Sequence, residues 1–346
     1  MHRLPATRYL EVSLVLGLLV YPVVQRDAFQ VDLIGKLFSF ALLGIALDLV
    51  WGYTGLLSLG HAAFFGWGGY MVGFVTVRGI WLLPKSIWLG LLLSVAVPTL
   101  AAVLLAGFLF SGRRAIGGAY FAISTLAVSY LSEQGALAWE PVLGGFNGIP
   151  NIPSYQVMLS SAHNLRLWSG TPFYYLAGGV LVAIYFLLRR WVDSRFGLVM
   201  RAVRDNEDRL PFLGYSTIRV KSVVFVVSAA IAGLGGGLYA LHEGYVSPPL
   251  LGFGLSTQAV LWVAVGGRGF LLGAIVGSLL VNYFSSALSG AFLTLWMIIL
   301  GGALVVIILK LPTGLVGAVL SWIEKRRRDH SFQERGPNGG EHSRHK

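Results

Sequence analysis

The sequence contains no cysteine among its 346 residues, and only 12% of them are charged. Without cysteine, the chain has no disulfide, no thiolate metal ligand and no cysteine nucleophile. A soluble domain usually carries about a quarter charged residues, whereas 55% of this chain is hydrophobic. The composition therefore excludes an ordinary soluble domain and indicates a protein of the membrane class.

Signals for catalysis are also missing from the sequence. It has no GxxxxGK[ST] phosphate loop, no HExxH and no GxSxG, and its His, Asp and Glu residues form no metal-binding cluster. We therefore expect neither an enzyme nor a bound metal or cofactor. The formal net charge is +11, but the positive residues are concentrated in loops and the tail. The positive-inside rule explains that distribution better than nucleic-acid binding does.

Apolar runs of about 20 residues recur along the chain, which is the length that a helix needs to cross a ~30 Å hydrocarbon core. They predict an all-α integral membrane protein, a polytopic bundle of about 8–10 transmembrane helices with Gly-broken segments. Residues 1–322 form the predicted transmembrane domain, with an external loop at 139–171 and a cytoplasmic polar segment at 191–218. Residues 323–346 form a basic cytoplasmic tail that we expect to be disordered.

Lysine and arginine residues indicate the orientation. With alternating spans and the N-terminus inside, twenty of them fall in predicted cytoplasmic segments and four in predicted external ones. Such a bias is typical of membrane proteins, whose cytoplasmic loops are rich in Lys and Arg. We therefore expect a multi-pass protein of the bacterial inner membrane with both termini in the cytoplasm.

Glycine-rich breaks interrupt the apolar pattern twice, between Asp48 and His61 and between Val260 and Phe270. Irregular backbone at membrane depth is tolerated where it is buried in protein or lines a water-filled cavity. Breaks in matching positions of two halves can mark an internal repeat and a translocation site. Glycines can equally serve only close helix packing. A further cluster, Gly233–Gly237, lies in the final part of the span predicted at Ser222–Leu241.

The first break supplies the main candidates for a substrate pathway. Thr54, Ser58 and freed backbone carbonyls would line it, and Asp48 and His61 flank it. Ionisable groups at membrane depth are costly and are functional hypotheses by default. His61 taken alone is also compatible with a packed, hydrogen-bonded histidine.

Weaker candidates lie further along the chain. Ser124 and Thr125 give one predicted helix a polar stripe, although such hydroxyls also bond to their own helix. Asn147 lies in the uncharged loop GGFNGIP, which is either an external gate or a tight turn. Arg268 in the second break either pairs with an acid such as Asp48 or lies at a cytoplasmic break.

The longest polar interval, RFGLVMRAVRDNEDRLPFLGYSTIRVK at 195–221, carries charges of both signs at helical offsets. This pattern predicts a short amphipathic helix outside the membrane, limited by Pro211, with Gly214 ending the next turn. Its length and mixed charge favour a partner surface over a solvated loop that only sets topology.

Several blocks resemble the permease subunits of the branched-chain amino-acid ABC importer family. They are GYTGLLSLGHAAFFGWGGY (52–70), GGAYFAISTLA (117–127) and SRFGLVMRAVRDNEDRLPFLGY (194–215), and the resemblance covers most of residues 40–317. It implies a homologous second permease subunit, two cytoplasmic ATPase subunits that use ATP, and a periplasmic substrate-binding protein. It also implies that the segment from 201 to 214 docks on an ATPase. The ATPase-coupling residues would be Arg201, Arg204, Asn206, Glu207 and Gly214. The run DRLPF at 208–212 departs from the small residues usual there.

Within this family, GGFNGIPN (144–151), WVAVGGRG (262–269) and LLVNYFSSALSGAF (279–292) are similar to the urea-importer branch. The resemblance implies import of urea or a short amide, with a branched-chain amino acid as the alternative substrate. Two other classes stay open. A passive urea channel would need no docking helix, and a proton-coupled transporter would use Asp48, His61 or Glu133 as a relay.

Overall fold

The computed structural model describes residues 5–25, 27–79, 85–110, 118–153, 156–160, 163–166 and 170–291, with short pieces at 298, 301–302, 305–306, 309–311 and 314–319. The predicted tail at 323–346 and most of the apolar run at 293–309 lie outside these residues. The described chain is almost entirely helical, which confirms the predicted all-α class.

Five of the described helices, α2, α4, α7, α9 and α11, are long and apolar enough to cross a membrane. The helices are α1 (Pro5–Val24), α2 (Ala28–Thr54), α3 (His61–Gly73), α4 (Ile87–Phe110), α5 (Gly118–Ala138), α6 (Glu140–Leu143), α7 (Gly170–Val192), α8 (Arg195–Asp205), α9 (Thr217–Glu243), α10 (Phe253–Gly266) and α11 (Leu271–Ala291). The short turns are η1 (Phe74–Arg78), η2 (Gly145–Asn147), η3 (Glu207–Arg209), η4 (Pro211–Leu213) and η5 (Pro248–Leu251).

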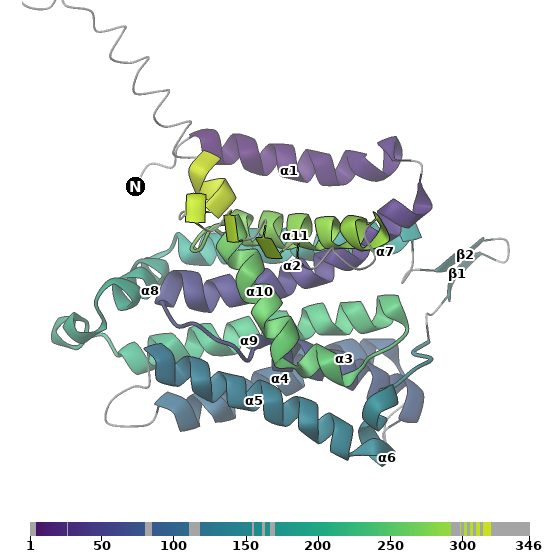
Figure 1. The fold of residues 1–346 in the computed structure, drawn as a ribbon, viewed down its shortest axis with the longest axis horizontal. Helices are drawn as coiled ribbons and strands as arrows, with labels where there is room; N and C mark the ends of the chain where they lie inside the picture. The colour runs from purple at the N-terminus through teal and green to yellow at the C-terminus, as the bar shows by residue number, and fades with distance from the viewer. Residues whose placement is uncertain are drawn as a thin grey trace, which may run out of the picture.

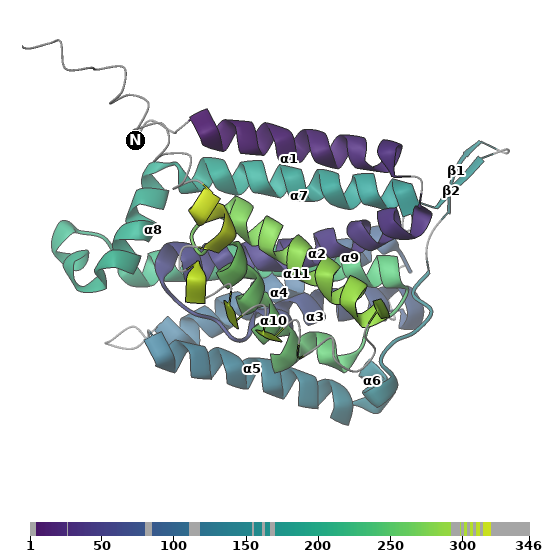
Figure 2. The same cartoon turned by 45° about the horizontal axis from the view of Figure 1, so that its top comes forward.

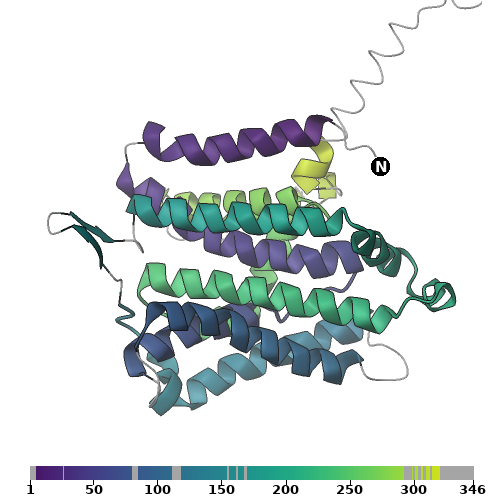
Figure 3. The ribbon, with the colours of Figure 1, turned by 180° about the vertical axis from the view of Figure 1, so that it is seen from behind.

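The helices α2 and α9 form the centre of the bundle. Each is 27 residues long, and they pack on one another as well as on α3, α4, α7 and α11. Figures 1 and 3 show them from opposite sides, with α1 at one edge of the bundle and α4 and α5 at the other. Both helices are mostly buried by protein, so their contacts are with other helices. Lipid is as apolar as leucine, so such contacts depend on close packing of small residues.

The Gly233–Gly237 cluster provides this close packing. A Cβ on Gly236 would lie 1.7 Å from the carbonyl oxygen of Phe65, and one on Gly68 would lie 2.0 Å from that of Gly233. The cluster therefore brings the backbones of α9 and α3 together. The span predicted at Ser222–Leu241 corresponds to α9, which runs unbroken through the cluster from Thr217 to Glu243.

The first glycine break lies later than the sequence suggests. The helix α2 continues through Asp48 to Thr54 and ends at Gly55, whose φ of 80° is the left-handed conformation that glycine adopts readily. The chain is then irregular until α3 starts at His61. The second break is confirmed, since α10 ends at Gly266 and Gly267 and Gly269 have φ of 118° and 80°.

The two ends of the bundle carry different structures. The helix α8 projects at one end, while α6 and a hairpin of β1 (Gln156–Ser160) and β2 (His163–Arg166) lie at the other (Figures 1 and 2). The strands are antiparallel, with Gln156 opposite Arg166. The loop before them is held to the chain after α9, because Ile149 and Val246 exchange backbone hydrogen bonds of 2.9 and 3.2 Å. The predicted external loop and the predicted cytoplasmic segment are thus at opposite ends.

The first helix lies along α7 at the edge of the bundle (Figure 2). Glu11, the charged residue that interrupts its apolar run, is buried, forms an ion pair with Arg189 and accepts a 2.8 Å hydrogen bond from the Tyr185 hydroxyl. Pairing is what allows a carboxylate to be buried in an apolar setting. Because Arg189 is in the last turn of α7, the start of α1 lies at the end that carries α8.

One face of α4 is exposed and apolar. Leu92, Leu100, Leu104 and Phe108 point away from the bundle, while Ser94 and Pro98 are buried against it. A contiguous apolar surface of this kind marks contact with lipid or with another subunit. It supports the membrane location.

Candidate functional site

The first break, Gly55 to Gly60, is held by hydrogen bonds from neighbouring helices. The N–H of Leu59 donates to Thr125 Oγ1 on α5 at 3.0 Å, and the N–H of Ala62 donates to Ser256 Oγ on α10 at 3.1 Å. The Ser58 hydroxyl accepts a longer bond from Gly60 N–H at 3.4 Å. The first N–H groups of a helix have no partner within it, so these hydroxyls satisfy the start of α3.

Four predicted pathway residues, Thr54, Ser58, His61 and Thr125, therefore come together at this break, and all are buried. The hydroxyls of Thr54 and Thr125 also donate to carbonyls of their own helices, to Val50 at 2.6 Å and to Phe121 at 2.9 Å. As the structure stands, both groups already have backbone partners.

The imidazole of His61 is enclosed at the start of α3. Its Nε2 lies 3.0 Å from Ser228 Oγ on α9, and its ring packs edge-on against Phe64 and Phe225. Nδ1 has no partner among the described residues. The geometry is that of a packed, hydrogen-bonded histidine, one of the two interpretations that the sequence allows.

Asp48 lies almost two turns before the end of α2 and is completely buried. Its Oδ1 accepts a 2.7 Å hydrogen bond from the N–H of Gly269 in the second break, while Oδ2 has no partner among the described residues. Gly52 makes the approach possible, since a Cβ there would lie 2.2 Å from Asp48 Oδ1 and 2.5 Å from Gly269 N. Asp48 thus links α2 to the second break.

The remaining predicted pathway residues are not brought to this place. Ser124 lies half-buried on α5, next to Thr125. Asn147 is exposed in η2, close to α6 at the hairpin end of the molecule. Asn147 thus lies apart from the first break, in the loop for which the sequence left an external gate or a tight turn open.

Arg268 lies in the second break at the α8 end. Its Nε donates to the carbonyl oxygen of Trp51 at 3.2 Å, and its guanidinium lies 5.1 Å from the centre of the Trp51 ring. Asp48 takes the backbone N–H of Gly269 as hydrogen-bond donor, with no hydrogen bond from the Arg268 side chain. The sequence left two positions open for Arg268, a pair with an acid such as Asp48 or a place at a cytoplasmic break. The structure places Arg268 in a break at the predicted cytoplasmic end.

The amphipathic helix predicted after α7 corresponds to α8, but α8 ends at Asp205, and Glu207 and Asp208 of the predicted charge pattern lie in the separate turn η3. Gly197, Met200 and Val203 face the bundle and are buried. Arg204 Nη1 donates to the carbonyl oxygen of Gly52 at 2.9 Å, and Arg201 Nη2 donates to that of Val192 at 3.1 Å. Gly52 is in the last turn of α2, so α8 is attached directly to the helix that also holds Asp48.

The turns after α8 have a second attachment. The carboxylate of Glu207 in η3 lies 2.5 Å from the ammonium of Lys221 on α9, and the Lys221 side chain is almost completely buried. Asn206 is extended and exposed where α8 ends, and Gly214 ends η4 with φ of 80°, as the sequence predicts. We call residues Arg195 to Tyr215 the α8 segment.

Sequence reasoning missed the apolar side chains that this segment exposes. Phe212 is 90% exposed and Leu213 is 71% exposed, with Leu198 and Tyr215 also exposed. Phe212 ends the DRLPF run, and with Leu213 it gives η4 two large apolar side chains that no core encloses. An exposed cluster of this type on a polar segment is typical of a protein-binding surface.

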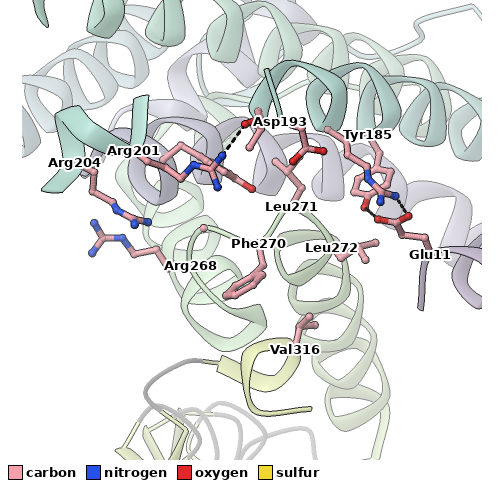
Figure 4. A pocket seen from close by; sticks show the side chains of 14 residues that line it. Glu11, Tyr185, Asp193, Arg201, Arg204, Arg268, Phe270, Leu271, Leu272 and Val316 are labelled. Atoms are coloured by element: carbon pink, nitrogen blue, oxygen red, sulfur yellow. Dashed lines mark hydrogen bonds and ion pairs between the residues drawn. The ribbon is translucent and has the colours of Figure 1, made fainter. Parts of the chain in front are cut away.

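A cavity of about 450 Å³ lies beside the α8 segment. In Figure 4, Arg201, Arg204 and Arg268 gather at one side of it, and Glu11 and Tyr185 lie at the other. Leu271, Leu272 and Val316 add apolar walls.

Comparison with known proteins gives a consistent result. The family model described as branched-chain amino acid transport system / permease component matches residues 30–309. The high-affinity branched-chain amino acid transport system permease protein LivM of Salmonella typhimurium is 30% identical over 306 residues, which cover 83% of this chain and 70% of that protein.

Other relatives have similar names. LivM of Escherichia coli is 30% identical, with 83% of this chain and 69% of that protein covered. LivH of Salmonella typhimurium, a permease protein of the same type of system, is 26% identical, with 81% and 91% covered. No solved structure matches the chain.

Proposed function

The chain belongs to the permease components of branched-chain amino acid type ABC transporters, and from this premise we propose that it is one membrane-spanning subunit of an importer. A homologous second permease would complete the pathway, two cytoplasmic ATPase subunits would use ATP, and a periplasmic binding protein would deliver the substrate. The chain itself has no phosphate-loop motif.

The observation that carries this proposal is the α8 segment. It projects at one end of the bundle, exposes Phe212 and Leu213, and is attached to α2 by Arg204 and to α9 by Glu207. Aromatic residues that fill a partner's pocket dominate binding energy at interfaces. Because the α8 segment is attached to α2 and α9, a movement of an ATPase bound to Phe212 would be passed to these two central helices.

The proposed orientation places this end in the cytoplasm of a bacterium, with the inner membrane around the bundle. The lysine and arginine bias supports it. The Glu11–Arg189 ion pair supports it as well, because it holds the start of α1 at the same end as α8.

For the substrate, we propose a branched-chain amino acid. The relatives' names favour it, and so does the first break, where the hydroxyls of Thr54 and Thr125 already have backbone partners. Urea needs amide-like donors and acceptors, and the single O–H donor of each of those hydroxyls is already used on a carbonyl of its own helix. Urea or a short amide is the second candidate, because three blocks of the sequence resemble the urea-importer branch.

Docking is tested with Phe212→Glu in cells that express the complete transporter. We expect the ATPase recovered with the purified permease to fall about tenfold or more, since burying a charge in place of an anchor costs at least about 2 kcal/mol. Phe146→Glu is the matched control, because Phe146 is 88% exposed at the opposite end. Equal recovery of the ATPase with both variants would contradict the proposal that Phe212 is part of the docking site.

The substrate is tested by uptake of ¹⁴C-leucine and ¹⁴C-urea into proteoliposomes that contain the complete transporter and its binding protein. We expect leucine uptake that requires internal ATP. ATP-dependent uptake of urea without uptake of leucine would agree with the family assignment and contradict the proposed substrate. Uptake of urea at the same rate with and without ATP would indicate a channel.

The proton-relay alternative is tested with Asp48→Asn. The asparagine keeps an oxygen that accepts from Gly269 N–H but has no titratable group. We expect uptake that still depends on ATP, with the same pH profile as the wild-type protein. Loss of a pH-dependent component would instead establish a relay.

A further inference from the structure

The helix α5 carries a polar stripe on the side that faces α3 and α10. Thr125, Ser129 and Glu133 recur every four residues, so they share one side of the helix. Thr125 accepts a hydrogen bond from the N–H of Leu59, just before α3. Ser129 donates to the carbonyl oxygen of Leu251, just before α10, at 2.5 Å. The first two members of the stripe therefore hold the chain at the starts of these two shorter helices.

Glu133, the third member, lies against the start of α10. A Cβ on Gly252, the residue before this helix, would lie 2.4 Å from Glu133 Oε2. Glu133 is partly buried, and it precedes Ala138, the last residue of α5, by about 7.5 Å along the helix axis. The carboxylate thus lies inside the predicted external end of the bundle, where α5 meets α10. We call this line of contact between the two helices the α5–α10 seam.

Glu133 differs from the other carboxylates on the helices of 20 or more residues. The others each have an ion pair or a backbone N–H donor: Glu11 with Arg189, Asp32 with Gly170, Asp48 with Gly269 and Glu243 with Lys36. Glu133 forms no ion pair and accepts no hydrogen bond within the described part of the chain. A carboxylate at this depth is costly without a cation, and the start of α10 supplies only a partial positive charge.

The exposed side of the α5–α10 seam is polar. The helix α10 crosses the front of the bundle and starts beside α5 (Figure 1). Gln134 on α5 and Gln258 on α10 are exposed, and a Cβ on Gly254 would meet open space. The outer face of α4 is different, because it exposes apolar side chains such as Leu100 and Leu104. Exposed amides are costly against lipid, so the seam is suited to face water and a partner subunit.

We propose that Glu133 binds the ammonium group of the amino acid as it passes between the two permeases. This inference rests on the proposed function, because an amino acid brings a cation and urea does not. A carboxylate and an ammonium form a charge-assisted hydrogen bond, which is stronger than one between neutral groups. Glu133 thus favours an amino acid over a neutral amide in the pathway.

The test is ATP-dependent uptake of ¹⁴C-leucine into proteoliposomes that contain the complete transporter, with leucine-saturated binding protein outside. Glu133→Gln keeps the shape of the side chain and removes its charge, and we expect it to lower uptake about tenfold. Glu133→Asp keeps the charge and should retain most of the uptake. The matched control is Glu140→Gln, which removes an exposed carboxylate at the same end outside the seam and should change nothing.

A purely structural role for Glu133 is separated by two further measurements on the same preparations. They are thermal unfolding and the ATP hydrolysis that the binding protein stimulates. We expect both to be unchanged in Glu133→Gln, because glutamine still packs against Gly252. Losses of stability and hydrolysis that match the loss of uptake would assign Glu133 to the packing of α10 and overturn the proposal.

The ammonium group itself is tested by competition with the wild-type transporter. Isopentylamine keeps the ammonium of leucine and lacks its carboxylate, whereas 4-methylpentanoate keeps the carboxylate and lacks the ammonium. At equal millimolar concentrations we expect isopentylamine to slow leucine uptake more strongly. Equal effects of the two compounds, whether large or absent, or a stronger effect of 4-methylpentanoate, would contradict the proposal.

Water access to the seam is tested by cysteine labelling, because the chain has no cysteine of its own. We expect Gln258→Cys to react with a membrane-impermeant methanethiosulfonate, measured as a mass shift of this chain. Leu100→Cys on the exposed face of α4 is the control and should not react. Equally slow reaction at both positions would place the seam in lipid and overturn the proposal.

The failure of this inference can be told from failure of the proposed function. A wild-type transporter that imports urea and no leucine would overturn both. Normal leucine uptake in Glu133→Gln, with uptake by the wild-type protein dependent on ATP, would overturn the role of Glu133 alone.

Discussion

The two glycine breaks lie close together in space but are held in different ways. The first, between α2 and α3, is buried, and hydroxyls of Thr125 and Ser256 bond to its backbone. The second, between α10 and α11, is held by charged side chains, with Asp48 bonded to Gly269 N–H and Arg268 bonded to Trp51. Neutral hydrogen bonds inside the bundle fix the first break, of which only Gly55 lies against Arg204 of α8, whereas charged side chains fix the second break.

The last turns of α2 join the two breaks. Gly52 is the residue against which Gly269 packs, and its carbonyl also accepts from Arg204. A displacement of α8 therefore reaches the end of α2 and the second break through one residue. The comparison suggests that the first break is a fixed support and the second is the part that responds to the α8 segment.

The largest expected effect is the loss of stability when a glycine of each break is replaced by alanine, which compares how rigidly the two breaks are held. Gly60→Ala places a Cβ 2.3 Å from the carbonyl oxygen of Thr125, where neither backbone can move easily. We expect it to lower the free energy of unfolding by about 3 kcal/mol. Gly269→Ala at φ of 80° should cost only about 1–2 kcal/mol. Thermal unfolding of the purified permease measures both, with Gly254→Ala, which meets open space, as control.

A smaller cost for Gly60→Ala than for Gly269→Ala would reverse the comparison. It would mean that the first break is the adaptable one.

An intermediate effect tests the second attachment of the α8 segment. Glu207→Gln leaves the buried ammonium of Lys221 without its carboxylate. Breaking a fully buried pair costs about 3–5 kcal/mol. Glu207 is about one-third exposed, so we expect about 2 kcal/mol, measured by denaturant or thermal unfolding.

The double variant Glu207→Gln/Lys221→Met is the matched control for this ion pair. It removes both charges and should recover most of the stability, because no unpaired charge remains. Equal destabilisation in the single and double variants would show that the pair does not hold the segment.

The smallest effect concerns the hydroxyl at the first break. Thr125→Val keeps the shape of the side chain but removes the acceptor for Leu59 N–H. We expect a loss of about 1–2 kcal/mol. Ser132→Ala is the control, since within the described part of the chain the Ser132 hydroxyl bonds to Val128 in its own helix and to no other element. Equal small losses in both variants would show that the first break does not depend on α5.

Local sequence signals predict the features that a few neighbouring residues determine. Glycine marks both breaks, charge periodicity predicts α8, and Pro211 with Gly214 predicts the turn after it. The sequence blocks shared with the family extend the prediction to function, because they are characteristic of the whole permease and not of a single local structure.

Contacts between distant residues could not be predicted in this way. Asp48 and Gly269 are 221 positions apart, and nothing near either one indicates the other. The sequence therefore gives Asp48 as the edge of the first break, while the structure places it inside α2 next to the second. Phe212 was missed because exposure depends on what covers a turn, and in the sequence DRLPF stands out only as a departure from the small residues usual in the docking segment.

The central claim is that the α8 segment drives transport through the link between Arg204 and Gly52. The most direct test is Arg204→Gln in proteoliposomes with the complete transporter, with leucine uptake and ATP hydrolysis measured in parallel. We predict that uptake falls about tenfold while the ATPase stays bound and continues to hydrolyse ATP. Arg195→Gln on the same helix should change neither. Normal coupled uptake in Arg204→Gln would contradict the claim.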